Sequence, residues 1–242
     1  MNFSARRNGL FDLRTVEACV FDFFGTLADV DVDLPDMWEY LNTIGYRCPL
    51  SLQQVWESDA FDGMTTPTFD DSSSYQVWRR TNVAAMATLS GVPADSLDSV
   101  VSELLDRDTR WTVKSIHGAS RVVDQLKALH LKVGLCTNWD YPLEKYLAQA
   151  NLAGFDAVTV SAVVGARKPH IIPFNDVIKK LQVEPSKALF VGDRWSTDIV
   201  GSIRAGFHPV WIRNASIQPE LAEIVTQFTS LSEFARWVAE QA

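Results

Sequence analysis

The chain has 242 residues, of which 47% are apolar and 21% are charged, so it has enough apolar material for a packed core and shows no sign of disorder. Its 22 basic and 30 acidic residues leave a formal charge of −8. This balance argues against nucleic acid as the main partner, because binding to a phosphate backbone depends on clustered lysine and arginine. Small phosphorylated substrates remain compatible with it, since a bound cation can reverse the local field.

No targeting or membrane-spanning segment is apparent. Arg6 and Arg7 are not followed by an apolar stretch, so we expect no signal peptide. No run approaches the roughly 20 apolar residues that span a bilayer. Cys19, Cys48 and Cys136 have no metal-like spacing. We therefore expect a soluble, cytoplasmic protein without a membrane partner, and the sequence does not indicate its oligomeric state.

The first expected strand covers residues 18–21, an apolar run that leads directly into Asp22 and then into the pair Gly25-Thr26. A buried strand that delivers a carboxylate to a tight turn is how a parallel sheet presents a nucleophile at its carboxyl edge. Phe24 lies two residues after Asp22, where this pattern often carries a second carboxylate. The chemistry of the site therefore depends on both positions.

Residues 34–110 carry helical patterns and no convincing strand, so we expect a helical insertion that covers the carboxyl edge of the sheet as a lid. The three acids within residues 29–33 are interpreted as an exposed hinge that enters this lid, and Ser74 is a candidate helix cap. The expected helices span residues 35–44, 51–60, 74–90 and 95–107.

In the second half of the chain, short apolar runs alternate with helical patterns. Such alternation implies a parallel sheet with right-handed crossovers and helices on both faces. We predict an α/β fold with a doubly wound, Rossmann-like parallel sheet and an inserted α-helical cap domain. The predicted core domain comprises residues 1–32 and 111–242, and the predicted cap comprises residues 33–110. The further strands are expected at residues 132–136, 157–160, 188–191 and 210–212.

Polar residues follow four of these strands, at the edge where an open α/β sheet binds its ligands. A carboxylate can attack phosphorus or carbon, while a hydroxyl and a lysine can hold phosphoryl oxygens. Paired carboxylates near the nucleophile can hold Mg²⁺, which prefers oxygen ligands. The polar residues are Asp22, Thr137 with Asn138, Lys168, and Asp193 with Asp198.

This set of motifs resembles the haloacid dehalogenase superfamily, in its branch with a helical cap inserted after the first motif. The resemblance covers nearly the whole chain from about Glu17 onwards. It is carried by Asp22-Phe23-Phe24-Gly25-Thr26-Leu27, Thr137-Asn138, Lys168-Pro169, and Gly192-Asp193 with Asp198.

The resemblance implies roles for the catalytic residues. It makes Asp22 the nucleophile and Thr137 a ligand of the transferred group, with Asn138 beside it. It also implies that Lys168 steadies the nucleophile and the phosphate, and that the cap supplies substrate specificity.

A magnesium ion is the cofactor that the resemblance implies. Asp193 and Asp22 would bind it together with the backbone carbonyl of Phe24, and Asp198 would support the site. In a reading from the residues alone, Asp193 and Asp198 are alternatively caps of the following helix.

Phe24 departs from the family pattern, because phosphatases of the family usually carry an acid/base aspartate there. Losing a positioned acid/base typically costs about 10²–10⁴-fold in rate. Members that displace halide from carbon commonly carry an aromatic residue at this position, but they usually lack the metal carboxylate that Asp193 provides. We therefore expect a Mg²⁺-dependent phosphatase of small phosphorylated metabolites that acts through an aspartyl-phosphate on Asp22. The alternatives are a 2-haloacid dehalogenase-like hydrolase and a catalytically weak or non-enzymatic ligand-binding protein.

Cap residues that contact substrate cannot be selected from the sequence. Trp139, next to the second motif, is interpreted as a packing residue, with pocket lining as the alternative. The candidates for gripping a substrate anion are Arg79, Arg80, Arg107 and Arg110.

Overall fold

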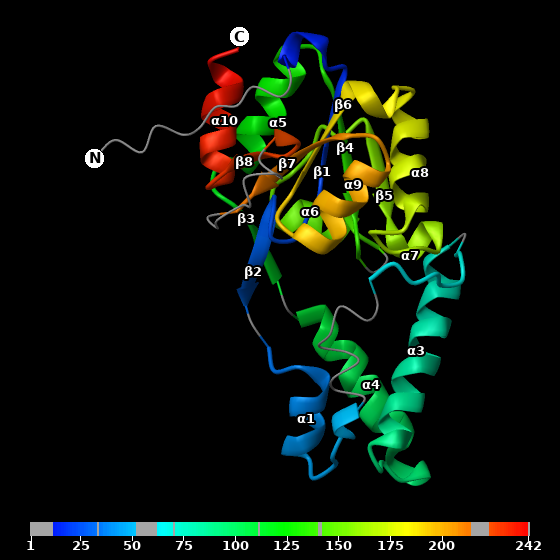
Figure 1. Ribbon diagram of the computed structural model, residues 1–242. Helices are drawn as coiled ribbons and strands as arrows, with labels where there is room; N and C mark the ends of the chain where they lie inside the picture. Colours follow the sequence, from blue (N-terminus) through cyan, green and yellow to red (C-terminus); the bar gives the residue numbers. More distant parts are fainter. Residues whose placement is uncertain are drawn as a thin grey trace.

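The fold is organised around a six-stranded parallel sheet with the strand order β5-β4-β1-β6-β7-β8 (Figure 1). The computed structural model describes residues 12–32, 34–51, 62–69, 71–110, 112–139, 142–213 and 223–241. The strands are β1 (Ala18–Phe21), β4 (Lys132–Thr137), β5 (Ala157–Val160), β6 (Ala188–Gly192), β7 (His208–Ile212) and β8 (Thr226–Phe228).

Strand β1 lies in the middle of the sheet, and all four of its residues are fully buried. A strand that is covered on both faces needs a continuous apolar run, and this is what residues 18–21 provide. Phe21 lies opposite Leu135 of β4 and Val191 of β6. This register brings the carboxyl ends of the three strands together.

Helices cover both faces of the sheet, as the doubly wound prediction requires (Figure 1). Cys19 and Phe21 pack into the cluster formed with α5 (Ala119–Ala128) and α10 (Leu231–Ala239). Ala18 and Val20 pack into the cluster formed with α8 (Ile171–Leu181). Alternate residues of β1 therefore supply the cores on opposite faces. The shorter helical segments are Leu13–Thr15, α6 (Glu144–Gln149), α7 (Ser161–Val164), Pro185–Lys187, the π-helical turn Trp195–Ile199 and α9 (Val200–Arg204).

The expected hinge at residues 29–33 is wrong for the part that the structure describes. Residues 28–32 form strand β2 (Ala28–Val32), which pairs antiparallel with β3 (Thr112–Ser115), while residue 33 lies outside the described residues. Alternating acidic and apolar residues suit a strand with one exposed face. The partner strand lies beyond the insertion, so local sequence gave no sign of the pairing.

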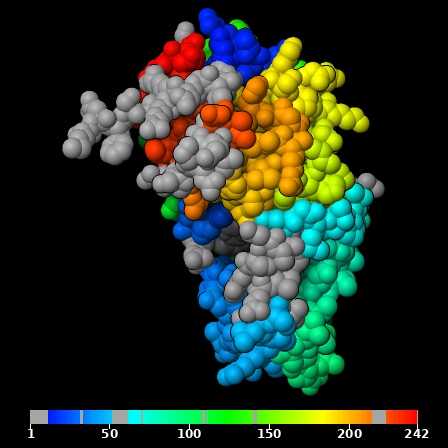
Figure 2. Space-filling view, in the orientation of Figure 1, coloured from blue at the N-terminus to red at the C-terminus, as the bar shows by residue number. Residues whose placement is uncertain are grey.

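Three helices of the insertion form a lobe at one end of the molecule (Figures 1 and 2). These are α1 (Met37–Thr43), α3 (Ser72–Leu89) and α4 (Ala94–Arg110), and they share an apolar cluster that includes Leu41, Val83, Met86, Val101 and Leu104. The expected helix at 51–60 lies almost wholly outside the described residues. We retain residues 33–110 as the proposed cap domain. Among the described helices, none combines the length and apolar character that crossing a bilayer requires.

Helix α3 begins two residues earlier than expected, and Ser74 is not its cap. The carboxylate of Asp71 accepts a hydrogen bond of 2.8 Å from the backbone N–H of Ser74, so Asp71 occupies the N-cap position. An N-cap carboxylate satisfies one of the backbone donors that a helix leaves unpaired at its start.

Candidate active site

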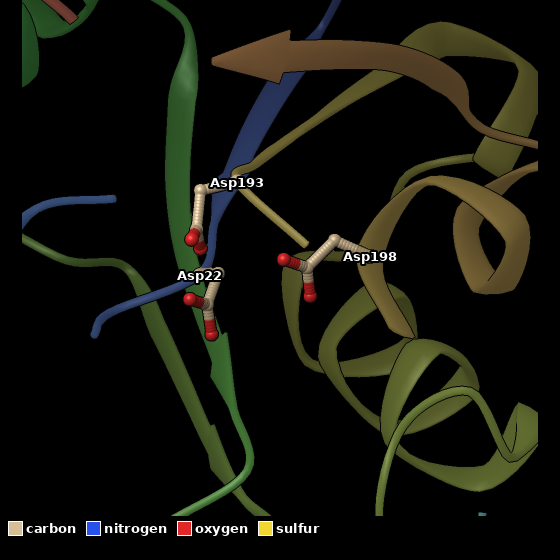
Figure 3. A group of neighbouring side chains, drawn as sticks. All are labelled: Asp22, Asp193 and Asp198. Carbon is tan, nitrogen blue, oxygen red and sulfur yellow. The ribbon is translucent and has the colours of Figure 1, made fainter. Parts of the chain in front are cut away.

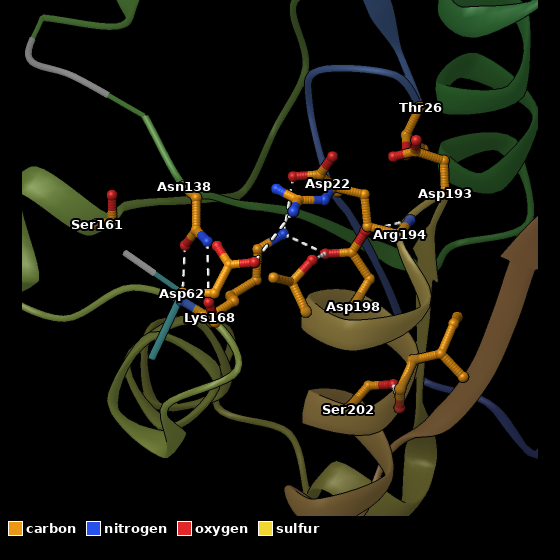
Figure 4. A network of polar contacts seen from close by, with 12 residues as sticks. Asp22, Thr26, Asp62, Asn138, Ser161, Lys168, Asp193, Arg194, Asp198 and Ser202 are labelled. Atoms are coloured by element: carbon orange, nitrogen blue, oxygen red, sulfur yellow. Dashed lines mark hydrogen bonds and ion pairs between the residues drawn. The ribbon is translucent and has the colours of Figure 1, made fainter. Parts of the chain in front are cut away.

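A buried lysine joins the first, third and fourth motifs. The Nζ of Lys168 donates to Oδ1 of Asp22 at 2.7 Å and to Oδ1 of Asp198 at 2.6 Å (Figure 4). Lys168 is 1% exposed, and both carboxylates are buried. Burial works to lower the pKa of Lys168, but the charges of Asp198 and Asp22 outweigh it and raise that pKa above its ordinary value. The lysine is therefore positively charged at neutral pH and fixes the orientation of Asp22.

Asn138 holds the backbone on which this lysine is mounted. Its Oδ1 accepts from the backbone N–H of Lys168 at 2.6 Å, and its Nδ2 donates to the carbonyl of Lys168 at 2.9 Å (Figure 4). Thr137, the last residue of β4, is 1% exposed. The amide of Asn138, directly after β4, is thus engaged with the loop that carries Lys168.

The turn after β1 needs a glycine because a carboxylate lies against it. Gly25 has a φ of +85°, and a Cβ at this position would lie 2.7 Å from Oδ2 of Asp193. Glycine adopts the left-handed conformation readily and has no Cβ to clash with the carboxylate. The neighbouring hydroxyl of Thr26 donates to Oδ1 of Asp193 at 3.3 Å (Figure 4). The Gly-Thr pair of the first motif is therefore shaped around Asp193.

Asp198 approaches from the π-helical turn that follows β6. Its Oδ2 accepts from the backbone N–H of Arg194 at 3.0 Å, but Asp198 lies within the turn and Arg194 is the N-cap, so Asp198 is not the helix cap of the alternative reading. A Cβ on Gly192 would lie 2.4 Å from the Cβ of Asp198. A glycine at the end of β6 is thus what allows Asp198 to lie this close to the strand.

Asp22, Asp193 and Asp198 form an acidic cluster, each with one carboxylate oxygen within 4.8 Å of the others (Figure 3). Burial raises the pKa of Asp22 to about 7, with Lys168 opposing this and Asp198 adding to it. Burial and the charge of Asp198 likewise raise the pKa of Asp193. Lys168 pairs with Asp22 and Asp198, and the largely exposed Arg213 lies 3.9 Å from Oδ2 of Asp193, so these two cations face three carboxylates.

A divalent cation fits this cluster. Two Mg–O bonds of about 2.1 Å span at most about 4.2 Å, and the three carboxylate oxygens lie within 4.8 Å of one another. Burial is the first cause of the raised pKa values of Asp22 and Asp193, so both carboxylates lack the solvation that a bound cation would replace. Carboxylate oxygens are among the ligands that Mg²⁺ prefers.

Phe24 faces other aromatic rings. Its ring centroid lies 5.5 Å from that of Trp139, whose ring also contacts Phe23 edge to face at 5.4 Å. Trp139 further contacts Tyr146 at 5.3 Å. Trp139 is therefore a packing residue, as expected, and it also lines a cavity, which was the alternative.

The insertion contacts the lysine loop directly through backbone hydrogen bonds. The N–H of Gly63 donates to the carbonyl of Lys168 at 3.1 Å, and the N–H of Arg167 donates to the carbonyl of Met64 at 2.9 Å. Thr66 donates to the carbonyl of Gly165 at 2.8 Å. This short antiparallel pairing places residues 63–66 against the loop that carries Lys168.

Three of the four arginines proposed as anion ligands are engaged within the insertion. Arg80 pairs with Asp98 at 2.6 Å. The guanidinium of Arg107 lies 4.4 Å from the centroid of the Tyr40 ring. Arg110 pairs with Glu103 and Asp106.

Arg167 was missed by sequence reasoning. It lines a cavity together with Trp139 and residues of the insertion. Its one sequence signal is its position directly before Lys168 in the third motif.

Comparison with known proteins agrees with the motifs and the fold. A family model described as haloacid dehalogenase-like hydrolase matches residues 16–206. The chain is 31% identical to the mouse (Mus musculus) haloacid dehalogenase-like hydrolase domain-containing protein 3, over 54% of this chain and 53% of that protein. It is 32% identical to a glyceraldehyde 3-phosphate phosphatase of Pyrococcus abyssi, over 42% of this chain and 43% of the relative. The chain thus spans about half the length of the curated relatives it matches.

A solved structure of a 2-haloacid dehalogenase from Pseudomonas syringae has the same fold, with a TM-score of 0.59 and 20% identity over 94% of this chain and 100% of the other. The family match begins two residues before β1, ends two residues after α9 and includes every motif residue described above. The chain therefore belongs to the haloacid dehalogenase-like hydrolases.

Proposed function

We propose that the chain is a Mg²⁺-dependent phosphatase of small phosphorylated metabolites that acts through an aspartyl-phosphate on Asp22. The observation that carries this proposal is the acidic cluster, because one carboxylate oxygen of Asp193 lies within 4.8 Å of one from Asp22 and one from Asp198. A carbon-centred displacement of halide has little need for a cation there, whereas phosphoryl transfer does. The relatives named glyceraldehyde 3-phosphate phosphatase support the same class of reaction.

The chain's own residues can perform the transfer in two steps. Lys168 holds Oδ1 of Asp22, which leaves Oδ2 to attack phosphorus. A bond forms between this oxygen and phosphorus, and the bond from phosphorus to the leaving-group oxygen breaks. A water molecule then attacks the same phosphorus, the bond to Asp22 breaks, and inorganic phosphate leaves while the water proton passes to solvent. The positive charge of Lys168 stabilises the phosphoryl oxygens in both steps.

Asp22, Asp193 and the Phe24 carbonyl would hold the magnesium ion, with Asp198 supporting the site. When bound, the ion supplies positive charge to the transferring phosphoryl group. Asp198 meanwhile keeps Lys168 in place through the hydrogen bond of 2.6 Å. We propose that the helical insertion, residues 33–110, is the cap that binds the rest of the substrate.

Phe24 restricts the leaving groups that the enzyme handles well. Without an acid at this position the leaving oxygen departs as an anion. The Phe24 ring, which packs against Trp139, has no proton to donate to it. We therefore propose a preference for phosphates whose leaving group is a stable anion, such as aryl or acyl phosphates, over alkyl phosphates.

The test is release of phosphate from 4-nitrophenyl phosphate with and without Mg²⁺. We expect activity in Mg²⁺, loss of activity in chelator, and loss of activity in Asp22→Asn. Asp124→Asn, which removes an exposed carboxylate from α5, is the matched control and should retain parent activity. Phosphate release that persists in chelator, or in Asp22→Asn, would contradict the proposal.

A second candidate function rests on Phe24, because an aromatic residue there suits displacement of halide, which leaves without a proton. In this reaction Asp22 attacks carbon and water then hydrolyses the ester. The same preparation should be tested for halide release from a short 2-haloacid with and without Mg²⁺. Metal-independent halide release, without phosphate release, would replace the phosphatase proposal by this one.

A further inference from the structure

A small cavity lies where the insertion meets the sheet-bearing part of the molecule. It has a volume of about 40 Å³, and we call it the Arg167 pocket. The insertion supplies Thr66, Phe69, Tyr75 and Trp78, and the other side is formed by Trp139, Ser161, Ala162 and Arg167. Aromatic rings thus make up much of its wall, and Arg167 is the cationic residue that lines it.

The guanidinium of Arg167 makes no hydrogen bond or ion pair with any residue in the part of the chain that the structure describes. Its Nε is buried without a hydrogen-bond partner. A buried donor that carries part of a positive charge is costly unless an acceptor satisfies it. Arg80 and Arg110, by contrast, are paired with acids although they are about half exposed. Arg167 itself is partly exposed, but its buried Nε lacks an acceptor, and the group that could supply one would have to enter the cavity.

The pocket adjoins the proposed active site through two chain neighbours. Arg167 directly precedes Lys168, whose Nζ contacts Asp22. Trp139 directly follows Asn138, and its ring lies 5.5 Å from that of Phe24. The ring contact between Phe24 and Trp139 links the first motif to the wall of the pocket, and we take this as the side on which the rest of the substrate lies.

We propose that Arg167 binds a carboxylate of the substrate, separate from the phosphoryl group that Asp22 attacks. This inference rests on the proposed phosphatase function and narrows its substrate class to phosphorylated compounds with a second, carboxylic acid group. The planar fork of a guanidinium matches the two oxygens of a carboxylate. A cavity of about 40 Å³ suits a group of three heavy atoms better than a ring. Aromatic walls lower the local dielectric and strengthen the attraction.

Binding can be tested without any phosphate chemistry. Trp78 and Trp139 line the pocket, so tryptophan fluorescence should report its occupation. Acetate and the neutral acetamide are titrated at constant ionic strength into the parent, Arg167→Met, and the control Arg80→Met. We expect a saturable response to acetate alone in the parent and the control, and none in Arg167→Met. Equal responses to acetate and acetamide, or an unchanged response in Arg167→Met, would overturn the proposal.

Specificity is tested with phenyl phosphate and its 2-, 3- and 4-carboxylated derivatives. We expect the parent to prefer at least one carboxylated isomer by about tenfold or more in kcat/KM, as one charged hydrogen-bonded contact supplies. Arg167→Met should bring this ratio close to one, Arg167→Lys should keep part of it, and Arg80→Met should keep all of it. A parent without preference, or a preference that survives in Arg167→Met, would refute the assignment.

The two proposals fail in different ways. If the protein binds acetate through Arg167 but releases no phosphate from any of these esters, the phosphatase proposal is refuted and the carboxylate site is supported. If the protein releases phosphate but shows neither acetate binding nor a preference for carboxylated esters, the phosphatase proposal is supported and the carboxylate site is refuted. The melting temperature of Arg167→Met should be no lower than that of the parent, whereas a structural role for Arg167 predicts a lower one.

Discussion

Replacing Asp22 by asparagine should stabilise the metal-free protein at pH 8, although we expect the same change to abolish activity. Burial raises the pKa of Asp22 to about 7, so ionisation of this carboxyl opposes folding when no cation is bound. Asparagine removes the charge and keeps an oxygen that accepts from Lys168, and Lys168 retains its contact with Asp198 at 2.6 Å. Function and stability are therefore in conflict at this residue.

The magnitude follows from the pKa difference. A change from 3.8 to about 7 is worth about 4 kcal/mol at about 1.4 kcal/mol per unit. The weaker hydrogen bond from Lys168 to a neutral oxygen offsets part of this gain, so we expect about 1–3 kcal/mol. For a chain of this size the melting temperature should rise by roughly 2–12 °C.

The pH dependence has a defined sign. A carboxyl group whose pKa is higher in the folded state makes the folded protein bind a proton more tightly, so stability falls as pH rises from about 4 to about 7. Below pH 4 both states of the parent carry the proton, and the parent and Asp22→Asn should be equally stable. Above pH 7 the difference should be complete.

The assay is thermal unfolding followed by circular dichroism in chelator between pH 4 and pH 8, with Asp124→Asn as the control for loss of an exposed carboxylate. Added Mg²⁺ should then raise the melting temperature of the parent more than that of Asp22→Asn, because a ligand stabilises the state that binds it. The reasoning is refuted if Asp22→Asn is less stable than the parent at pH 8 in chelator, or if the difference is the same at pH 4.

Three further substitutions test the surroundings of the nucleophile. Asn138→Ala removes both hydrogen bonds to the Lys168 backbone and leaves a buried N–H unpaired, so urea unfolding should show a loss of about 2–4 kcal/mol, and a loss below 0.5 kcal/mol would contradict this. Gly25→Ala places a Cβ 2.7 Å from the Asp193 carboxylate, so the Mg²⁺-dependent rise in melting temperature should shrink; an unchanged rise would count against Asp193 as a ligand. Phe24→Asp should raise turnover of an alkyl phosphate relative to an aryl phosphate by about 10²-fold, and an unchanged ratio would show that no acid is missing.

The sheet could be predicted from the sequence because its strands are buried on both faces. Such strands are short apolar runs, and residues 18–21 and 188–191 are clear examples. The two-stranded sheet of β2 and β3 could not be predicted, since neither strand is continuously apolar and each finds its partner across the whole insertion. The edge strand β8 was not predicted either, because its three residues, Thr226–Phe228, are too few to form a recognisable apolar run.

The candidate site was predictable where it depends on the ends of parallel strands. Asp22, Lys168 and Asp198 meet because neighbouring strands end at one edge, which topology alone implies. The engagement of Asn138 with the lysine loop depends on side-chain geometry that no spacing rule contains. Arg167 was missed because its importance depends on where the insertion lies, and that position depends on backbone pairing between residues 63–66 and 165–168.

Phe24 and Arg167 both bear on the negative charge of the leaving group: Phe24 cannot protonate it, and Arg167 can attract it. Trp139 contacts the Phe24 ring and lines the Arg167 pocket, so both residues adjoin the part of the substrate that leaves. A leaving group that departs without a proton develops negative charge, and a guanidinium without an acidic partner in the described chain attracts that charge in surroundings of low dielectric. A carboxylated leaving group held there is already an anion, so it is drawn towards Arg167 before the reaction begins. The proposed carboxylate site would therefore make the loss of an acid at position 24 compatible with catalysis for a narrow class of substrates, those with an anionic leaving group.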